Sequence, residues 1–266
     1  MTDELETTFR GARFRGTDFR GATFRECDMR QVRIVGSEIA DLYISGFAGQ
    51  IQNLVVNDVD VTAFVESELD RRQPERLQLR AVRTAEDHRA MWATIERLWS
   101  NTLTRAQRLP ESARDAKTDD EWSLVETLRH LIFATDVWVG RMVLGEPKPY
   151  HALGLPPTDY PAEDAAGLGL DIAARPSFTD VMEVRADRMT LMRSIVTNVT
   201  DAELDAMRTG EPAPGWGEES LSVRRCLRVV LNEECEHHRY AVRDLALLEA
   251  TDEPATDLAT ARECGG

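Results

Sequence analysis

The residues best suited to chemistry lie in the stretch LNEECEHHRYAVRDL, residues 231–245, which reads as part of a helix. The apolar stripe of this helix runs through Leu231 and Leu245, and the same spacing passes through Glu234 and His238. An unpaired carboxylate or imidazole on a stripe that faces the core costs on the order of 2–7 kcal/mol. These two side chains therefore require a compensating group.

A metal ion is one group that would compensate them. Glu234 and His238 are four residues apart on one helical face, so they can hold one ion while a facing helix supplies a third donor. Three nitrogen and oxygen ligands leave a position open for water or substrate, as in catalytic zinc sites. We expect a divalent metal, with zinc first and nickel or iron as alternatives, because ligand type alone does not fix the metal.

Helices must position these side chains, and the sequence predicts several. Residues 61–72 read as a short helix that leads into a linker. Longer amphipathic segments follow at about 85–108, 121–143, 177–199 and 220–248. Ser177, which follows Pro176, is a helix-cap signal for the third of them. Four helices of this length imply a bundle, and bundles build metal and ligand sites from side chains on facing helices.

The N-terminal block has a different period. From Phe9 it reads FRGARFRGTDFRGATFRECDMRQVR, and every fifth residue is large and apolar. These residues are Phe9, Phe14, Phe19, Phe24, Met29, Ile34, Ile39 and Ile44. Neither a helix nor a strand has this period. The block resembles a pentapeptide repeat, which implies a right-handed β-helix whose large residues stack inside the coil.

Charge separates this block from the rest of the chain. Residues 9–33 carry seven arginines against Asp18, Glu26 and Asp28, a net charge of +4. Pentapeptide proteins that mimic DNA are negatively charged, so we do not expect DNA mimicry here. We interpret the block as a stabilising or docking appendage.

Composition disfavours several classes of protein. The formal net charge of −15 and a pI near 4.8 disfavour non-specific binding to nucleic acid or to an anionic membrane. No apolar run approaches the ~20 residues of a membrane span, and the N-terminus lacks the pattern of a signal peptide. The four cysteines show no CxxC spacing. We therefore expect a cytoplasmic protein with reduced thiols.

Two short motifs resemble those of the DinB-like, YfiT-like superfamily of metal-binding four-helix bundles. EWSLVETLRHL resembles the second-helix motif, whose histidine, here His130, is a metal ligand. EECEHHRYAVRDL resembles the last-helix motif HxxxHR, and aligning its HR on His238 and Arg239 puts the preceding ligand at Glu234. The resemblance thus implies a metal site of His130, Glu234 and His238. The mycothiol-dependent maleylpyruvate isomerases of this superfamily are similar in using His, Glu and His.

Each of these residues also has a plainer interpretation. His130 can be a core histidine that is hydrogen-bonded to a backbone carbonyl. Glu234 can pair with Arg228 or with an arginine of another helix, which is the commoner fate of a helical glutamate. His237 lies one step round the helix from His238 and replaces it as a ligand if the register of the motif is shifted.

The predicted fold is mainly α, a DinB-like four-helix bundle preceded by a short right-handed pentapeptide-repeat β-helix. We expect the pentapeptide segment in residues 1–60 and a short helix and linker in residues 61–84. The bundle should occupy residues 85–250, and residues 251–266 should form a disordered tail.

The resemblance implies an enzyme that uses a low-molecular-weight thiol, such as mycothiol or bacillithiol. The enzyme would transfer this thiol to a small electrophile, or would use it to isomerise the electrophile. The open metal position would lower the pKa of that thiol, or would activate water for hydrolysis. The alternative is a non-catalytic stress-response module whose pentapeptide coils dock a protein partner. We expect a small-molecule substrate or thiol as partner, with neither nucleic acid nor membrane, and we leave homodimer formation open.

Overall fold

The computed structural model describes residues 8–25, 27–46, 51–119 and 121–252. The chain divides into two compact units, Met1–Gln52 and Asn53–Gly266. The tail expected from residue 251 onward lies almost entirely outside the described residues.

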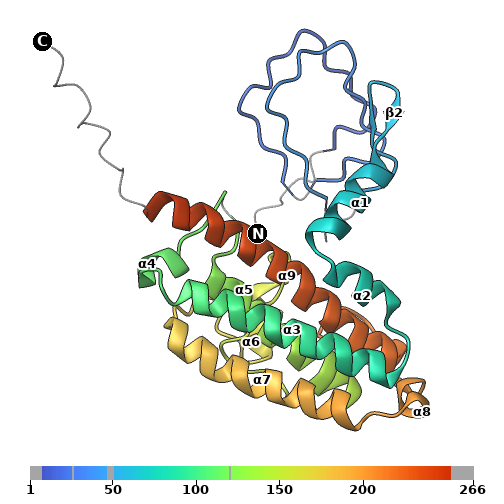
Figure 1. Cartoon of the computed structure of the whole chain (residues 1–266), viewed down its shortest axis with the longest axis vertical. Helices are drawn as coiled ribbons and strands as arrows, with labels where there is room; N and C mark the ends of the chain where they lie inside the picture. Colours follow the sequence, from blue (N-terminus) through green and yellow to red (C-terminus); the bar gives the residue numbers. More distant parts are fainter. Residues whose placement is uncertain (1–7, 26, 47–50, 120, 253–266) are drawn as a thin grey trace, which may run out of the picture. The chain divides into compact units, whose positions relative to one another are not determined.

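In the N-terminal unit the backbone winds in coils (Figure 1), and its φ angles show that the turns recur every five residues. Positive φ angles recur at Gly11, Gly16, Gly21, Gln31, Gly36 and Asp41. Backbone hydrogen bonds close turns from Ala12 N to Phe9 O at 2.8 Å and from Ala22 N to Phe19 O at 3.0 Å. The repeat of the sequence is therefore also a repeat of the backbone. Residues 8–25 and 27–46 contain no assigned strand, so the right-handed β-helix remains a prediction.

The phenylalanines of this unit contact one another. The ring centroids are 5.7 Å apart for Phe9 and Phe14, 5.4 Å for Phe14 and Phe19, and 6.2 Å for Phe19 and Phe24. The same four residues are 46% to 65% exposed, and no described residue of the unit is buried. The described part of this unit therefore encloses no core of its own.

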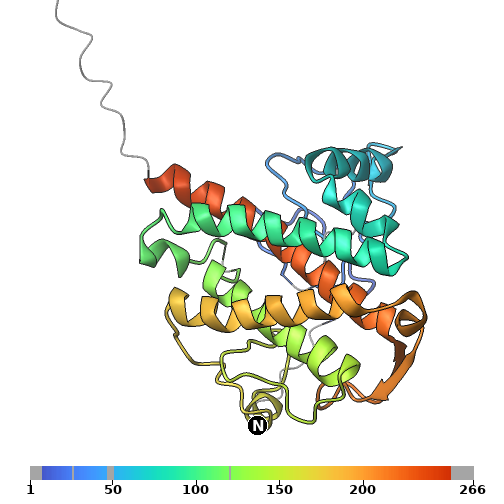
Figure 2. The ribbon, with the colours of Figure 1, turned by 60° about the horizontal axis from the view of Figure 1, so that its bottom comes forward.

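Four long helical segments form the body of the second unit (Figures 1 and 2). They are α3 (Ala85–Ala106), α5 (Leu124–Thr135) with its π-helical continuation η2 (Asp136–Val143), α7 (Phe178–Asn198) and α9 (Val223–Asp252). Helices α3 and α5 each pack against both α7 and α9. The four long helices predicted from the sequence are confirmed, and none of the described helices is long and apolar enough to cross a membrane.

Shorter elements complete this unit. They are β1 (Val55–Val56), β2 (Val59–Asp60), α1 (Thr62–Arg72), α2 (Glu75–Ala81), α4 (Glu111–Arg114), α6 (Ala162–Gly167), α8 (Asp201–Leu204), β3 (Met207–Gly210) and β4 (Glu219–Ser222). Strand β1 pairs antiparallel with β2, and β3 pairs antiparallel with β4. Helix α1 is the short helix predicted at residues 61–72.

Side-chain caps explain where the long helices begin. Ser123 accepts a hydrogen bond from the Glu126 backbone N–H at the start of α5. Ser177 caps α7 in the same way, as the sequence predicts. The Ser222 hydroxyl accepts from the Arg225 N–H at 3.3 Å at the start of α9. Each cap satisfies a backbone donor that the first helical turn leaves unpaired.

The connection between η2 and α7 is folded against α5. The buried Arg129 guanidinium donates to the backbone carbonyls of Leu153, Asp171 and Ala174. A small second core forms beneath the connection from Phe133, Val137, Tyr160, Ala165, Leu170 and Ala213. These contacts fix the segment beside the helix that carries His130.

Candidate metal centre

Helix α9 carries two glutamate–histidine pairs with the same spacing, Glu233 with His237 and Glu234 with His238. Adjacent residues on an α-helix point about 100° apart, so the two pairs meet different neighbours. The contacts of the first pair lie on α5, and those of the second pair lie on α3 and α7.

The first pair meets His130. The His130 Nε2 lies 3.4 Å from Glu233 Oε2, and the His237 Nε2 lies 3.2 Å from the same oxygen. One donor atom from each of these three residues lies within 4.8 Å of the others. No other three histidine, cysteine, aspartate or glutamate ligands come so close within the described residues. Two imidazoles and one carboxylate are thus arranged to hold one cation.

Hydrogen bonding orients the His130 ring toward this point. The His130 Nδ1 lies 3.0 Å from the Leu155 carbonyl oxygen, which can act solely as an acceptor. Nδ1 therefore carries the proton, and in the neutral ring Nε2 presents a lone pair to Glu233. Metal-ligating histidines are commonly held by such a bond from the other ring nitrogen.

Trp122 covers one side of the cluster. Its ring centroid is 4.6 Å from that of His130, and it stacks on His237 at 5.9 Å. The His130 and His237 side chains are 9% and 15% exposed, whereas the Glu233 side chain is 33% exposed. The cluster therefore opens to solvent on the side of its carboxylate.

The protonation states of the cluster suit a metal. Burial would raise the pKa of Glu233, but the neighbouring His130 and His237 rings outweigh burial and hold that pKa below its usual range. The part due to His130 requires a positive charge at its Nε2 side, which a metal ion would supply in place of a proton. Burial lowers the pKa of His237, although Glu233 opposes this shift. An ionised carboxylate and a neutral imidazole are the forms in which these side chains bind metal ions.

Glu234 is occupied elsewhere. Both of its carboxylate oxygens accept from the Arg185 Nη2 of α7 at 2.5 Å, and the side chain is completely buried. Burial raises the pKa of Glu234, and Arg185 offsets part of this rise. Pairing with an arginine of another helix is one of the two plainer interpretations of the sequence. Arg228, the other arginine considered, instead donates to the Leu79 carbonyl.

His238 is also turned away from His130. Its Nε2 lies 2.8 Å from the Thr102 hydroxyl of α3, and its ring meets Trp99 edge-on at 5.3 Å. Burial lowers the pKa of His238 to about 4. The structure therefore does not bring together the predicted ligands His130, Glu234 and His238. His130 keeps its predicted place, and Glu233 and His237 stand where Glu234 and His238 were expected.

The sequence contains signals for this arrangement. Glu233 and His237 have the same i,i+4 spacing as the predicted pair, but aligning the motif on Arg239 fixes the register one residue later. Arg185 lies on the buried stripe of α7, between Val181 and Met192. Opposite charges on two buried stripes predict an ion pair between the helices.

Within residues 51–119 and 121–252, the two cysteines of the second unit are not suited to act as nucleophiles. Burial raises the pKa of Cys226 to about 11, and burial also raises the pKa of Cys235. Buried thiols with raised pKa values are inert, because the thiolate is the reactive form.

Two family models match the chain. A model described as the DinB superfamily matches residues 94–241, more than half of the chain, and includes His130, Glu233 and His237. A model described as pentapeptide repeats (9 copies) matches residues 5–45. Both matches confirm the resemblances drawn from the sequence motifs. No curated protein and no solved structure matches the chain at a significant level.

Proposed function

The chain belongs to the DinB superfamily, and we propose that His130, Glu233 and His237 bind one divalent metal ion. The observation that carries this proposal is the approach of His130 Nε2 to Glu233 Oε2 at 3.4 Å, while His130 Nδ1 donates to Leu155. In the neutral ring both facing atoms carry lone pairs, so a cation between them would turn repulsion into coordination. The alternative to a metal ion between these two atoms is a proton on His130.

The donor set favours zinc among the common metals. Two imidazole nitrogens and one carboxylate oxygen are typical of catalytic zinc sites, which keep a further position for water or substrate. Nickel and iron accept the same donors. Trp122 covers one side of the cluster, and Glu233, whose side chain is 33% exposed, lies on the other, so a small molecule would approach past Glu233.

We propose that this site serves a thiol-dependent transfer or isomerisation of a small electrophile. A bound metal would supply Lewis acidity, which lowers the pKa of a thiol or of water. Cys226 and Cys235, the two cysteines among the described residues of the second unit, are unreactive because their thiols are buried with raised pKa values. The nucleophile would therefore come from solution, as a low-molecular-weight thiol such as mycothiol or bacillithiol, or as water.

Metal analysis tests the first part of the proposal. The full chain is prepared with zinc, nickel or iron supplied separately, and the metal content of the folded protein is measured. We expect one ion per chain in the wild type and its loss in His130→Ala and in His237→Ala. The matched control is His238→Ala, which should keep its metal. A wild-type chain that stays empty with all three metals contradicts the proposal.

Turnover tests the second part. The metal-loaded protein is mixed with mycothiol or bacillithiol and a panel of electrophiles, and consumption of the thiol is measured. We expect metal-dependent consumption that is lost in His130→Ala. Bound metal with neither thiol consumption nor hydrolysis across the panel would reject the enzymatic proposal while leaving metal binding in place.

Bound metal without thiol consumption or hydrolysis would favour a binding module. The exposed phenylalanines of the N-terminal unit, from Phe9 to Phe24, favour this function because exposed apolar patches mark interaction surfaces. In this case the metal would be structural, and the repeat would dock a protein partner.

A further inference from the structure

Trp122, which lies against the metal cluster, comes just before the first turn of α5. Its ring centroid is 4.6 Å from that of His130 and 5.9 Å from that of His237. The two histidines belong to different helices, α5 and α9, so one side chain packs on candidate ligands from both. Any large movement of either imidazole therefore disturbs its packing against Trp122.

The residue before Trp122 is tied to α9 by an ion pair. Glu121 accepts a hydrogen bond from the Arg243 Nη2, and the Arg243 Nε donates to Asp244 at 2.7 Å. Burial would lower the pKa of Arg243, but its hydrogen bonds to Asp244 and Glu121 raise that pKa. One guanidinium thus holds together two carboxylates that would otherwise repel each other.

Arg243 also packs on an aromatic ring beside the cluster. Its guanidinium lies 5.3 Å from the centre of the Tyr240 ring, and that ring meets the His237 ring edge-on at 6.0 Å. The contacts therefore close a circuit that starts and ends at His237 and passes through Tyr240, Arg243, Glu121 and Trp122. A change at Arg243 reaches the histidines through both of its neighbours in this circuit.

The main chain on either side of Trp122 is fixed independently of this ion pair. The Glu121 N–H donates to the Thr118 carbonyl at 2.9 Å, and the Ser123 hydroxyl accepts from the Glu126 N–H at 3.2 Å. Helix α5 can therefore begin at its cap whether or not the ion pair is present. The ion pair instead acts on how the segment that carries Trp122 is held against α9.

We propose that the Glu121–Arg243 ion pair clamps Trp122 over the two histidine rings of the cluster and thereby slows the release of the ion. Glu121 and Arg243 are positioning residues, because neither is among the three residues whose donor atoms meet. An ion leaves such a site only after its imidazole ligands turn away from it, and Trp122 lies against both rings. The slowed release rests on the metal site proposed above, whereas the covering of the histidines holds in the metal-free chain as well.

Chemical modification of histidines in the metal-free full chain tests the clamp without a metal. Diethyl pyrocarbonate modifies neutral imidazoles, and tandem mass spectrometry gives the rate at each histidine. We expect Glu121→Gln to raise the rate at His237 about two- to fivefold, the effect of a partly exposed ion pair. The rate at His238, which lies against Trp99 on the other face of α9, should not change and is the internal standard. Equal rates at His237 in the wild type and in Glu121→Gln overturn the proposal.

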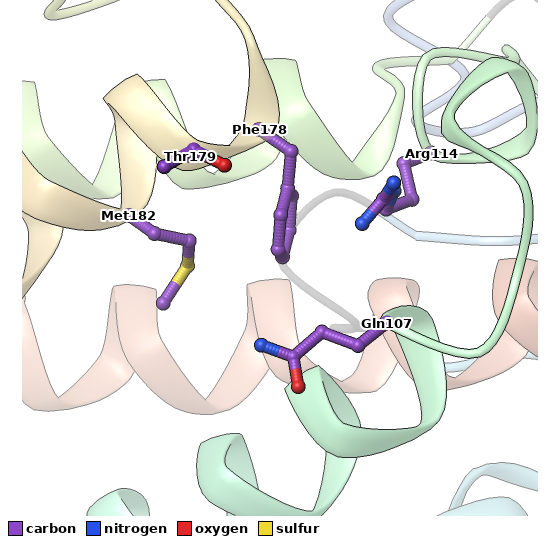
Figure 3. A pocket seen from close by; sticks show the side chains of 5 residues that line it. All are labelled: Gln107, Arg114, Phe178, Thr179 and Met182. Atoms are coloured by element: carbon purple, nitrogen blue, oxygen red, sulfur yellow. The ribbon is translucent and has the colours of Figure 1, made fainter.

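Two control variants separate the clamp from a general loosening of the bundle. Glu249→Gln breaks the Arg105–Glu249 ion pair, which joins α3 to α9 at 2.8 Å with a similar exposure. Arg114→Gln removes a guanidinium that lies 4.8 Å from the centre of the Phe178 ring, in a pocket at the other end of the connection between α3 and α5 (Figure 3). Neither variant should change the rate at His237. A control that raised this rate as much as the test variant would overturn the proposal.

The rate of metal release measures the consequence for the site. The metal-loaded full chain is mixed with excess chelator, and the loss of metal is followed in time. We expect release about two- to fivefold faster in Arg243→Met and about tenfold faster in Trp122→Ala, which also loses the ring packing. Arg243→Lys keeps the charge and should release metal nearly as slowly as the wild type. Unchanged release in both Arg243→Met and Trp122→Ala overturns the proposal. A wild-type chain that binds no metal contradicts the metal site alone, because the modification rates still test the clamp.

Discussion

Two neighbouring faces of α9 carry the same residue types at the same spacing, yet they differ in chemistry. The Glu233–His237 face meets a third potential ligand and reaches solvent through Glu233. The Glu234–His238 face is closed, with the carboxylate held by Arg185 and the imidazole by Thr102. Residue type and spacing identify both pairs as unusual. The side chains that the neighbouring helices present decide which pair can hold a metal.

Substitutions on the two faces should therefore affect different properties of the protein. Changes on the closed face should lower the free energy of unfolding and leave metal content intact. Changes on the open face should remove metal and leave the apo protein nearly as stable as before.

Breaking the buried pair should have the largest effect. Arg185→Met leaves the Glu234 charge buried without a partner, and we expect the free energy of unfolding to fall by about 3–5 kcal/mol. Urea unfolding of the metal-free protein measures this loss. The double variant Arg185→Met, Glu234→Leu should recover most of it, because no charge is then left unpaired. A single variant as stable as the wild type would show that the pair is not a structural element.

Removing the carboxylate of the open face should act on metal alone. Glu233→Gln keeps the shape of the side chain and removes its charge, so metal affinity should fall by about 10³-fold. This is more than the loss of about 10–100-fold that follows from removing a residue that hydrogen-bonds to a metal ligand. Competition with a chelator of known affinity measures the change. Glu234→Gln is the matched control one residue away, and it should keep its affinity in the folded fraction. If the two results were reversed, the sequence-predicted set with Glu234 would be right.

Acid should act in part through the closed face, because burial lowers the pKa of His238 as it lowers that of His237 on the open face. Burial lowers the pKa of His238 to about 4, below its ordinary value of 6.5, so the folded protein resists protonation of this ring. The contribution of His238 to stability is complete above pH 6.5 and is lost as the pH falls toward 4, by up to about 3 kcal/mol. Unfolding free energies measured across this range should fall less steeply in His238→Gln. Parallel pH profiles for the two proteins would contradict the buried, neutral state of this histidine.

The smallest expected effect concerns the partner of that imidazole. Thr102→Val removes the hydroxyl that lies 2.8 Å from His238 Nε2, which should cost about 1 kcal/mol of unfolding free energy. Thr104→Val, two residues away on an exposed part of α3, is the control and should change stability little. Metal content should stay the same in both variants. A loss of metal in Thr102→Val would show that the two faces of α9 are coupled. The contacts of the two faces do not predict such coupling.

Much of the fold follows from local sequence signals. The four long helices lie where the apolar periodicity predicts them, because each must bury one stripe to form at all. The Ser177 cap and the five-residue repeat of the N-terminal block are also local features. The folded state of the connection after η2 was not predictable in this way. It depends on Arg129, whose guanidinium binds carbonyl groups of distant residues.

The sequence by itself determined the superfamily, the helices, His130 as a member of the cluster, and the burial of Glu234 and His238. Tertiary structure alone decided which glutamate–histidine pair meets His130. A bundle helix contacts several neighbours at once, so positions about 100° apart can both be inside the protein. Periodicity reports that a position is buried, but it does not report which helix covers it. That information lies in the packing of α5 against Glu233 and His237 and in the reach of Arg185 from α7 to Glu234.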